Sequence, residues 1–348
     1  MKLSDEKRNV KDFSLKELEV ELSKSGEKPY RAKQIFAWLY QKGAKDFNEM
    51  SDLSSSLRET LRNKFRIPTY NIIKKQISKL DGTKKYLFGL EDGETVEAVL
   101  IPRKDRYTVC LSSQVGCAFG CKFCASGIAG IKRDLRSSEI LDQVVGILDD
   151  LRGNRITNIV IMGMGEPLAN YDNVIKAIAI LNSPFGFGIG ARKITISTAG
   201  YIPGIKRFMK EKTQIELSIS LHGATDKVRS YLMPINKKYP LEELMKVCHD
   251  YVKEKNRIIT FEYVLIKDLN ASREDAIALS KLLDALPCKV NLIPFNPVSN
   301  FGFLPPADKD VKEFQKTLKR SGINSTVRTQ RGADIDAACG QLRLRETK

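Results

Sequence analysis

The stretch "CAFGCKFCASG", residues 117–127, places three cysteines within eight positions, at Cys117, Cys121 and Cys124. A closed zinc site needs four ligands, and neither Cys nor His occurs in the ten residues that follow Cys124. A [4Fe-4S] cluster offers four irons, each of which takes a ligand. Three thiolates from one loop would therefore hold such a cluster and leave one iron open to another molecule.

Two other interpretations of this loop stay open at this point. The thiols could be unrelated core cysteines, because free cysteine is often buried. They could also bind zinc together with a fourth ligand from elsewhere in the chain. The C-x3-C-x2-C spacing favours the cluster, because the glycines around it let one short loop wrap three corners of a cube.

The composition of the 348 residues predicts a chain with a sizeable core and a polyanionic partner. Hydrophobic residues make up 42% of the chain, and the formal net charge is +16. Contacts of Lys and Arg with phosphate are favourable because they release counterions, although a solvated basic surface is the alternative. No apolar run approaches the ~18 residues that span a membrane, and the first 13 residues lack the apolar core of a secretory signal. We therefore expect a cytoplasmic protein without membrane attachment.

Residues 1–70 are predicted to form a small, basic helical domain, because leucines and other apolar residues recur there at helical spacing. The predicted helices lie at 14–26, 30–43 and 51–65. Ser51 is the expected N-cap of the third helix. From residue 71 to 104 the pattern changes to short strands with glycine turns, which predicts a short β linker or extension.

After residue 105 the pattern alternates between strands and helices. Six strand–helix units fill the core domain predicted for residues 105–348. Most of the predicted strands are continuous apolar runs, as in a parallel sheet covered by helices. Six units are too few for a closed eight-unit barrel, so the sequence predicts an α/β fold with an open or partial barrel. Ligands of such folds bind at the carboxyl ends of the strands.

The cysteine spacing and the six-unit pattern resemble the radical S-adenosyl-L-methionine (SAM) superfamily, whose members fold into a partial (β/α)6 barrel. Phe123, beside the last cysteine, fits the aromatic residue that is usual in the motif of that superfamily. The resemblance implies that the open iron of a [4Fe-4S] cluster binds the amino and carboxylate groups of SAM. One electron from the cluster then yields a 5′-deoxyadenosyl radical.

Polar residues at the ends of the predicted strands agree with this resemblance. The glycines of "MGMGEP" would let the backbone approach a ligand, and its carboxylate would bind an amino group. Each serine or asparagine alone could also be an ordinary strand-end cap, and a structural role for His222 stays open. The predicted SAM-binding residues are Gly165, Glu166, Ser197, Ser220, Leu221, His222 and Asn296.

Further motifs resemble the RlmN/Cfr family of RNA adenine methyltransferases over essentially the whole chain. They are "SSQVGCAFGCKFCASG", "MGMGEPLAN", "ITISTAG", "SLHG", "MPINKKYP", "NLIPFNP" and "DIDAACGQL". The resemblance implies methylation at C2 of an adenosine in the peptidyl-transferase centre of 23S rRNA and of the adenosine beside the anticodon of certain tRNAs. It also implies a flavodoxin- or ferredoxin-type electron donor and an RNA-binding role for the N-terminal domain. We expect a monomer.

The same resemblance assigns roles to three residues outside the cysteine loop. C2 of adenine is electron-poor and does not attack the methyl group of SAM, whereas a thiolate does. Cys339 would take a methyl group from one SAM, and a second SAM would convert this S-methylcysteine into a carbon radical that adds to C2. Glu97 would accept the C2 proton, and Cys110 would free the product by forming a disulfide with Cys339. Glu97 lies in an alternating strand, so a solvated side chain is its alternative interpretation.

Three other functions stay open. A Cfr-type methyltransferase would act on C8, but Pro167 after "GMGE" and the segment "NLIPFNP" favour C2 by analogy. A non-enzymatic RNA-binding iron–sulfur protein would need neither an open iron nor Cys339. A radical SAM enzyme for a small molecule is disfavoured by the charge of +16 and by the basic N-terminal helices. The basic runs at 132–136 and 331–334 lie near the predicted site in the sequence and are candidate RNA contacts.

Overall fold

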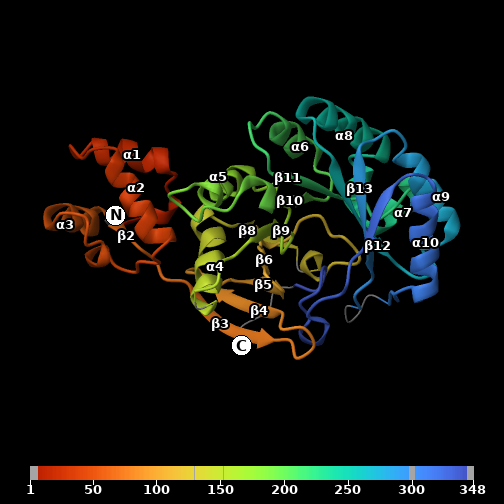
Figure 1. Ribbon diagram of the computed structural model, residues 1–348, viewed down its shortest axis with the longest axis horizontal. Helices are drawn as coiled ribbons and strands as arrows, with labels where there is room; N and C mark the ends of the chain where they lie inside the picture. The colour runs from red at the N-terminus through yellow and green to blue at the C-terminus, as the bar shows by residue number, and fades with distance from the viewer. Residues whose placement is uncertain (1–6, 129, 152, 298–301, 343–348) are drawn as a thin grey trace.

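The structure, a computed structural model, describes residues 7–128, 130–151, 153–297 and 302–342. Figure 1 shows a small helical unit, coloured red, at one end of the molecule beside a larger α/β body. The body is built on one ten-stranded sheet. None of the helices in these ranges is long and apolar enough to cross a membrane.

The sheet runs in the order β14-β13-β12-β11-β10-β9-β6-β5-β4-β3. Neighbouring strands from β6 to β14 are parallel, whereas β3 to β6 pair antiparallel. The strands are β3 (Asn71–Ile77), β4 (Lys84–Gly89), β5 (Thr95–Arg103), β6 (Arg106–Cys110), β9 (Asn158–Ile161), β10 (Ile194–Thr198), β11 (Glu216–Ser220), β12 (Ile259–Leu265), β13 (Cys288–Pro294) and β14 (Asn324–Val327). The segment 71–104 therefore extends the barrel sheet, because β5 pairs directly with β6.

Helices follow the parallel strands and lead the chain back along the sheet. They are α4 (Ser137–Asp150), α5 (Tyr171–Asn182), α6 (Ile202–Met209), α7 (Asp226–Leu232), α8 (Leu241–Lys255), α9 (Arg273–Leu282) and α10 (Asp308–Arg320). The six predicted strand–helix units and the partial barrel are confirmed. Because these strands all run in the same direction, their carboxyl ends meet at one edge of the sheet.

The N-terminal unit consists of three helices with a short pair of strands. Its first helix begins with a capping box, in which Ser14 Oγ accepts from the Glu17 N–H and the Glu17 carboxylate accepts from the Ser14 N–H. The elements are β1 (Arg8–Asn9), η1 (Val10–Asp12), α1 (Leu15–Ser23), α2 (Tyr30–Tyr40), η2 (Phe47–Glu49), α3 (Ser55–Lys64) and β2 (Phe65–Arg66). The three predicted helices are therefore present.

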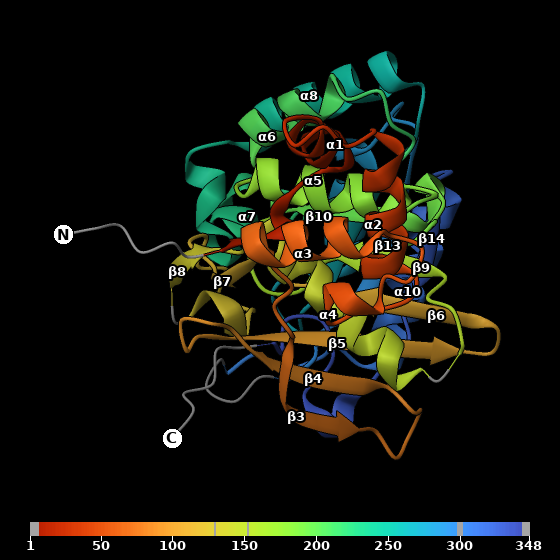
Figure 2. The ribbon, with the colours of Figure 1, turned by 90° about the vertical axis from the view of Figure 1, so that its left-hand side faces the viewer.

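Ion pairs fasten this unit to helices of the body. The buried Lys11 ammonium group lies 2.6 Å from Asp142 Oδ1 of α4 and also donates to the Pro68 carbonyl at 2.6 Å. Lys176 of α5 contacts the carboxylate of Glu17 at 3.0 Å. Figure 2, seen from the side of the unit, shows α1 to α3 in front of the body. These contacts attach the unit to α4 and α5.

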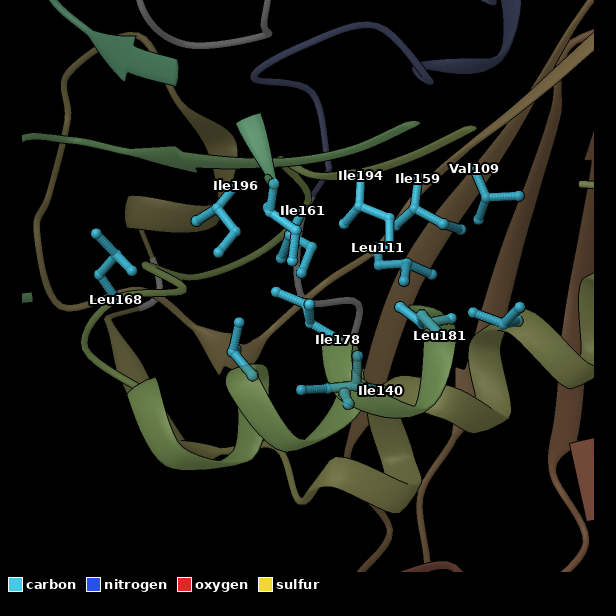
Figure 3. Close-up of a cluster of buried hydrophobic side chains, with 14 of the residues drawn as sticks. Val109, Leu111, Ile140, Ile159, Ile161, Leu168, Ile178, Leu181, Ile194 and Ile196 are labelled. Atoms are coloured by element: carbon cyan, nitrogen blue, oxygen red, sulfur yellow. The ribbon is translucent and has the colours of Figure 1, made fainter. Parts of the chain in front are cut away.

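Apolar side chains fill the space between the sheet and its helices. Figure 3 shows isoleucines of β9 and β10 pointing towards apolar side chains of α4 and α5. The labelled residues, all buried, are Val109, Leu111, Ile140, Ile159, Ile161, Leu168, Ile178, Leu181, Ile194 and Ile196. Burying one side chain of this size contributes roughly 1.5–3 kcal/mol. This layer holds the helices on one face of the sheet and leaves the other face for the site.

Polar side chains alternate with apolar ones along β10 and β11, which differs from the predicted continuous apolar runs. In β10, Thr195 alternates with the buried Ile194 and Ile196, and in β11 Ser218 lies between the buried Leu217 and Ile219. Thr195 and Ser218 line a cavity on the inner face. The strands alternate because helices cover only their outer face, whereas the inner face surrounds this cavity.

The third helix begins three residues later than its predicted cap implies, because Ser54 rather than Ser51 is the N-cap. Ser54 Oγ accepts from the Leu57 N–H at 3.3 Å. Ser51 lies in a turn, where its N–H donates to the Glu49 carbonyl at 2.8 Å. Leu53, between the two serines, is buried in the core of the unit before the helix starts.

Replacing Ser54 with alanine should lower the free energy of unfolding by about 1 kcal/mol, because the N-cap hydrogen bond is lost. Ser51→Ala is the matched control and should change it by less than about 0.5 kcal/mol. Urea unfolding followed by circular dichroism measures both values. Equal losses in the two variants would contradict the assignment of the cap.

Candidate active site

The inner faces of the strands surround a cavity of about 540 Å³. Its lining includes three cysteines, a glutamate, an arginine and an asparagine: Cys110, Cys124, Cys339, Glu262, Arg328 and Asn296. The cavity therefore joins the loop 117–124, hereafter the cysteine loop, to two cysteines that are distant from it in the sequence.

The cysteine loop begins at a tight turn. It connects β7 (Gln114–Gly116) with η3 (Ala125–Gly127), and β8 (Ile131–Asp134) pairs with β7. Gly116 has a φ of +82°, and a Cβ atom there would lie 2.0 Å from the Gly130 carbonyl oxygen. Only glycine can adopt this conformation in this space. The same close approach lets the Cys117 N–H donate to that carbonyl at 2.9 Å, which fixes the first cysteine of the loop.

Burial raises the pKa of every thiol in the cysteine loop. The pKa of Cys117 rises to about 12. At Cys121 the negative charges of the other two thiolates add to the effect of burial. At Cys124 burial is partly opposed by hydrogen bonds from Ser126 and Gly127. The three sulfurs are therefore close enough to repel one another as thiolates, and hydrogen-bond donors already point at them.

This donor set fits a [4Fe-4S] cluster. Cluster irons are held by thiolates, and hydrogen bonds to the sulfurs tune them. Each thiolate binds a different iron, so the three sulfurs need not converge on one point. Among the residues that the structure describes, no three His, Cys, Asp or Glu side chains converge as a site for a single metal ion requires.

Glu166 lies beside the cysteine loop, after the end of β9. Its buried carboxylate accepts from the backbone N–H groups of Ala199 at 2.7 Å and Leu168 at 3.1 Å. Burial, the largest effect, raises its pKa to about 7 despite these donors. Gly165 precedes it with a φ of +98°, where a Cβ atom would lie 2.5 Å from Gln114 Cβ. A single buried carboxyl group thus lies near the cysteine loop, whose thiols are affected by its charge.

The remaining predicted SAM-binding residues lie along the same edge of the sheet. Ser197 is in β10, Ser220 ends β11, and Leu221 and His222 follow it, whereas Asn296 follows β13. Asn296 Nδ2 donates to the Cys339 carbonyl at 3.2 Å. The edge that carries the predicted SAM contacts is therefore also the edge that contacts Cys339.

His222 connects the cysteine loop with two strands. Its Nδ1 accepts from the Val264 N–H at 3.0 Å, and its carbonyl accepts from Asn270 Nδ2 at 2.8 Å. Its ring stands edge-on to that of Phe123, with the ring centroids 4.7 Å apart. Burial lowers the pKa of His222 to about 3, so the ring is neutral at physiological pH. These contacts position the ring between Phe123 and β12.

Sequence reasoning missed Arg229, a fully buried residue of α7. Its guanidinium group donates to the carbonyls of Ala199 at 2.7 Å and Leu221 at 3.1 Å, and to Asn236 Oδ1 at 2.6 Å. It thereby joins the ends of β10 and β11. The motif "MPINKKYP" contains Asn236 and was a signal for this region, but an arginine on a short helix does not by itself indicate burial.

Cys110 ends β6 and Cys339 lies in the C-terminal segment, and both line the cavity. Burial, and after it the charge of the Cys339 thiolate, raise the pKa of Cys110 to about 12. Burial also raises the pKa of Cys339, and the positive charge of Arg328 opposes this. The Cys339 side chain is exposed, so it is accessible in the cavity that it lines.

A buried glutamate that pairs with a partly exposed arginine beside the two thiols was also missed. Glu262 Oε1 lies 3.4 Å from Arg328 Nη1 and accepts from Asn291 Nδ2 at 2.9 Å. Glu262 Oε2 is buried and has no hydrogen-bond partner among the described residues. The sequence did indicate a buried and partnered charge here. Glu262 is the one carboxylate in the apolar run "RIITFEYVLI", where burial of a charge is costly without a partner.

The solvated interpretation of Glu97 is wrong. Its side chain is 2% exposed, and its Oε1 lies 3.3 Å from the ammonium group of Lys85, which is equally buried. Glu97 alternates along β5 in step with Val99 and Ile101, which line the cavity. The alternating pattern indicated half-burial, but it could not show that β4 places a cation beside this carboxylate.

Two hydrogen bonds to backbone carbonyls hold the C-terminal segment against the residues that follow the cysteine loop. The Ala125 N–H donates to the Gly340 carbonyl at 2.7 Å, and Ser126 Oγ donates to the Leu342 carbonyl at 2.6 Å. Ala125 and Ser126 directly follow the last cysteine of the loop. The structure therefore brings Cys339 to the cysteine loop although the two are far apart in the sequence.

Comparison with known proteins identifies the class to which this fold and cysteine loop belong. Residues 111–279 match the radical SAM superfamily, and residues 8–67 match the ribosomal RNA large subunit methyltransferase N-terminal domain. The crystal structure of a radical SAM methyltransferase from Sphaerobacter thermophilus is 43% identical with a TM-score of 0.91, covering 96% of this chain and 99% of that chain. The fold and the site thus define a radical SAM methyltransferase.

Curated relatives narrow the class to one family. A probable dual-specificity RNA methyltransferase RlmN from Thermoanaerobacter sp. (strain X514) is 48% identical over 98% of this chain and 99% of its own length. The protein of the same name from Staphylococcus saprophyticus is 46% identical over 99% of this chain and 94% of its own length. The chain therefore belongs to the RlmN family of radical SAM RNA methyltransferases, and the resemblance predicted from its motifs is confirmed.

Replacing Arg229 with methionine should lower the free energy of unfolding by about 3 kcal/mol, because several buried acceptors lose their donor at once. Arg207→Met is a suitable control, because Arg207 pairs with Asp172 on the surface and its loss should cost less than about 1 kcal/mol. Urea unfolding measures both variants. A loss at Arg229 no larger than that at Arg207 would refute its role in joining the strand ends.

Proposed function

We propose that this chain transfers a methyl group to C2 of adenosine in 23S rRNA and in tRNA. The observation that carries the proposal is that Cys110 and Cys339 line one cavity, together with Cys124 of the cysteine loop. A methyl carrier and a second thiol for its release need this arrangement, whereas a structural or electron-carrying cluster does not. The printed names of the relatives, dual-specificity RNA methyltransferases, support RNA as the substrate.

The cysteine loop would hold three irons of a [4Fe-4S] cluster, and SAM would occupy the fourth. Bound together, they supply a 5′-deoxyadenosyl radical. Glu166 would accept a hydrogen bond from the amino group of SAM, because it is a buried carboxyl group beside the loop. The other residues that would contact SAM are Gly165, Ser197, Ser220, Leu221, His222 and Asn296.

Cys339 would carry the methyl group, because a thiolate attacks the sulfonium methyl of SAM and the electron-poor C2 does not. The positive charge of Arg328 supports this role, since it opposes the burial that raises the pKa of both Cys339 and Cys110. After one hydrogen atom is removed from the S-methyl group, its carbon would bond to C2. One electron would then leave this adduct, which links the RNA to Cys339, and the cluster, oxidised by one electron when SAM was cleaved, would supply its acceptor.

Glu97 and Cys110 would complete the reaction. Glu97 would accept the C2 proton, and its buried position in the strand that lines the cavity supports this role. Cys110 would then attack the sulfur of Cys339, so that a disulfide forms and the bond from sulfur to the new carbon breaks. The released carbon would take up a proton and become the methyl group. An external reductant would restore the two thiols.

The RNA would be attracted by the charge of +16, to which the N-terminal unit contributes. The basic run at 132–136 is a poorer candidate for phosphate contacts than its sequence indicates. Lys132 pairs with Glu94, Arg133 with Asp92, and Arg136 with Glu91, so acidic partners already balance these charges. We further infer that the protein acts as a cytoplasmic monomer with a flavodoxin- or ferredoxin-type electron donor.

Mass spectrometry of RNA treated with the reconstituted enzyme, SAM and dithionite tests the proposed function. We expect 2-methyladenosine as the product. Cys339→Ala should abolish methylation but not the formation of 5′-deoxyadenosine, because the cluster site stays intact. Cys288→Ala, a half-buried cysteine outside the cavity lining, serves as the control and should keep most of the activity. A main product of 8-methyladenosine would overturn the C2 assignment, and methylation by Cys339→Ala would overturn the methyl carrier.

Release of the RNA from the adduct should accelerate with pH. Burial raises the pKa of Cys110 to about 12, so its thiolate fraction at pH 7 is small and grows about tenfold per pH unit up to pH 9. Gel electrophoresis of the RNA–protein adduct in single turnovers at pH 7, 8 and 9 measures its lifetime. The adduct of Cys110→Ala should persist at each pH. A lifetime that does not shorten as the pH rises would argue against Cys110 as the resolving thiol.

A further inference from the structure

Lys85 is a deeply buried cation that the reaction proposed above does not use. Its side chain is 2% exposed on β4. Its neighbour Lys84 points to the other face of the strand, where it pairs with Asp150 at 2.8 Å nearer to solvent. Burying an ammonium group is costly unless partners compensate for the lost water. Lys85 therefore needs partners inside the protein, and two of them are defined.

The first partner is Glu97 of β5. The strand pairing puts Lys85 opposite Val99, so Glu97 is its diagonal neighbour on the same face of the sheet. Lys85 Nζ lies 3.3 Å from Glu97 Oε1. Since Val99 lines the cavity, the ion pair lies on the same face of the strand pair as this part of the lining. The pair thus places a cation directly beside the carboxylate that would accept the C2 proton.

The second partner is the backbone of the C-terminal segment. Lys85 Nζ donates to the Asp336 carbonyl at 3.1 Å. Asp336 has a φ of +51°, a conformation that a residue other than glycine keeps only where its surroundings enforce it. Cys339 follows three positions later in the same segment. One ammonium group thus touches both the carboxylate of Glu97 and the segment that carries Cys339.

The turn between β3 and β4 supports the same contact from outside. The Gly332 N–H donates to Asp81 Oδ2 at 3.0 Å, and the Lys79 N–H donates to Asp334 Oδ2 at 2.9 Å. These bonds fasten residues 332–334 to the turn just before the chain reaches Lys85. The segment therefore contacts the strand pair at successive points, of which Lys85 is the innermost.

We propose that Lys85 is a positioning residue that links Glu97 to the segment carrying Cys339. The inference rests on the proposed function, in which Glu97 removes the C2 proton from an adenine bonded to Cys339. In the adduct, the adenine is bonded to Cys339 of this segment. Glu97, the proposed proton acceptor, is held to the same segment through Lys85. The Glu97 carboxylate and the C2 proton thereby keep a fixed distance and orientation during the proton transfer.

The test follows the C2 proton itself. RNA with deuterium at adenine C2 is reacted in the Cys110→Ala background, where the adduct persists, and mass spectrometry measures the deuterium that the adduct retains over time. Lys85→Met should slow the loss of deuterium by about 10²-fold at pH 7. Lys85→Arg keeps the charge and should restore most of the rate.

Lys11→Met is the matched control. Lys11 is a buried lysine that also donates to a carboxylate and to a backbone carbonyl, those of Asp142 and Pro68, outside the cavity. Its loss should lower stability and leave the deuterium loss unchanged. Equal slowing in Lys11→Met and Lys85→Met, or a rate in Lys85→Arg as slow as that in Lys85→Met, would show a structural role only and overturn the inference.

Glu97→Gln separates the inference from the proposed function. If Glu97→Gln loses deuterium at the parent rate, the assignment of the base fails and this inference fails with it. If Glu97→Gln loses deuterium slowly while Lys85→Met loses it as fast as the parent, the assignment of Glu97 as proton acceptor is supported and only the role of Lys85 is refuted.

Discussion

Every strand of the barrel must satisfy two opposite demands, because successive side chains point to opposite faces of a sheet. The outer face packs against helices and has to be apolar, as Ile194 and Ile196 are. The inner face surrounds the site and has to offer polar groups, as Thr195 does. The apolar layer stabilises the sheet, and the rigid sheet then holds polar side chains from many strands around one cavity. The rest of the site depends on this division.

The fold and much of the candidate site could be predicted from the sequence, since both follow local patterns. Strand–helix alternation indicates a parallel sheet, and the ends of parallel strands meet at one edge, so Glu166 and Asn296 could be placed there. Contacts that depend on strand register could not be predicted. Lys85 and Glu97 meet as diagonal neighbours of β4 and β5, which only the pairing defines. Ser54 replaced Ser51 as a cap because the burial of Leu53 decides where the helix begins.

Charged residues inside the barrel are costly to bury, and the structure pairs most of them. Glu262 pairs with Arg328, and Glu97 pairs with Lys85. Arg328 is shared, because its charge acts on both thiols as well as on Glu262. Loss of Arg328 would therefore change the electrostatic surroundings of Glu262 and of both thiols at once.

The turn between β3 and β4 has the outward form of an ordinary surface hairpin, a type of loop in which insertions and deletions are usually tolerated. In this chain its Asp81 and Lys79 hold the C-terminal segment from outside, while Lys85 holds it from inside. One inserted residue would change the length of this hairpin and would displace the segment that carries Cys339. The length of the turn therefore has to be kept for the site to form, as the residues of the site do. Tags or grafted sequences belong elsewhere on the protein.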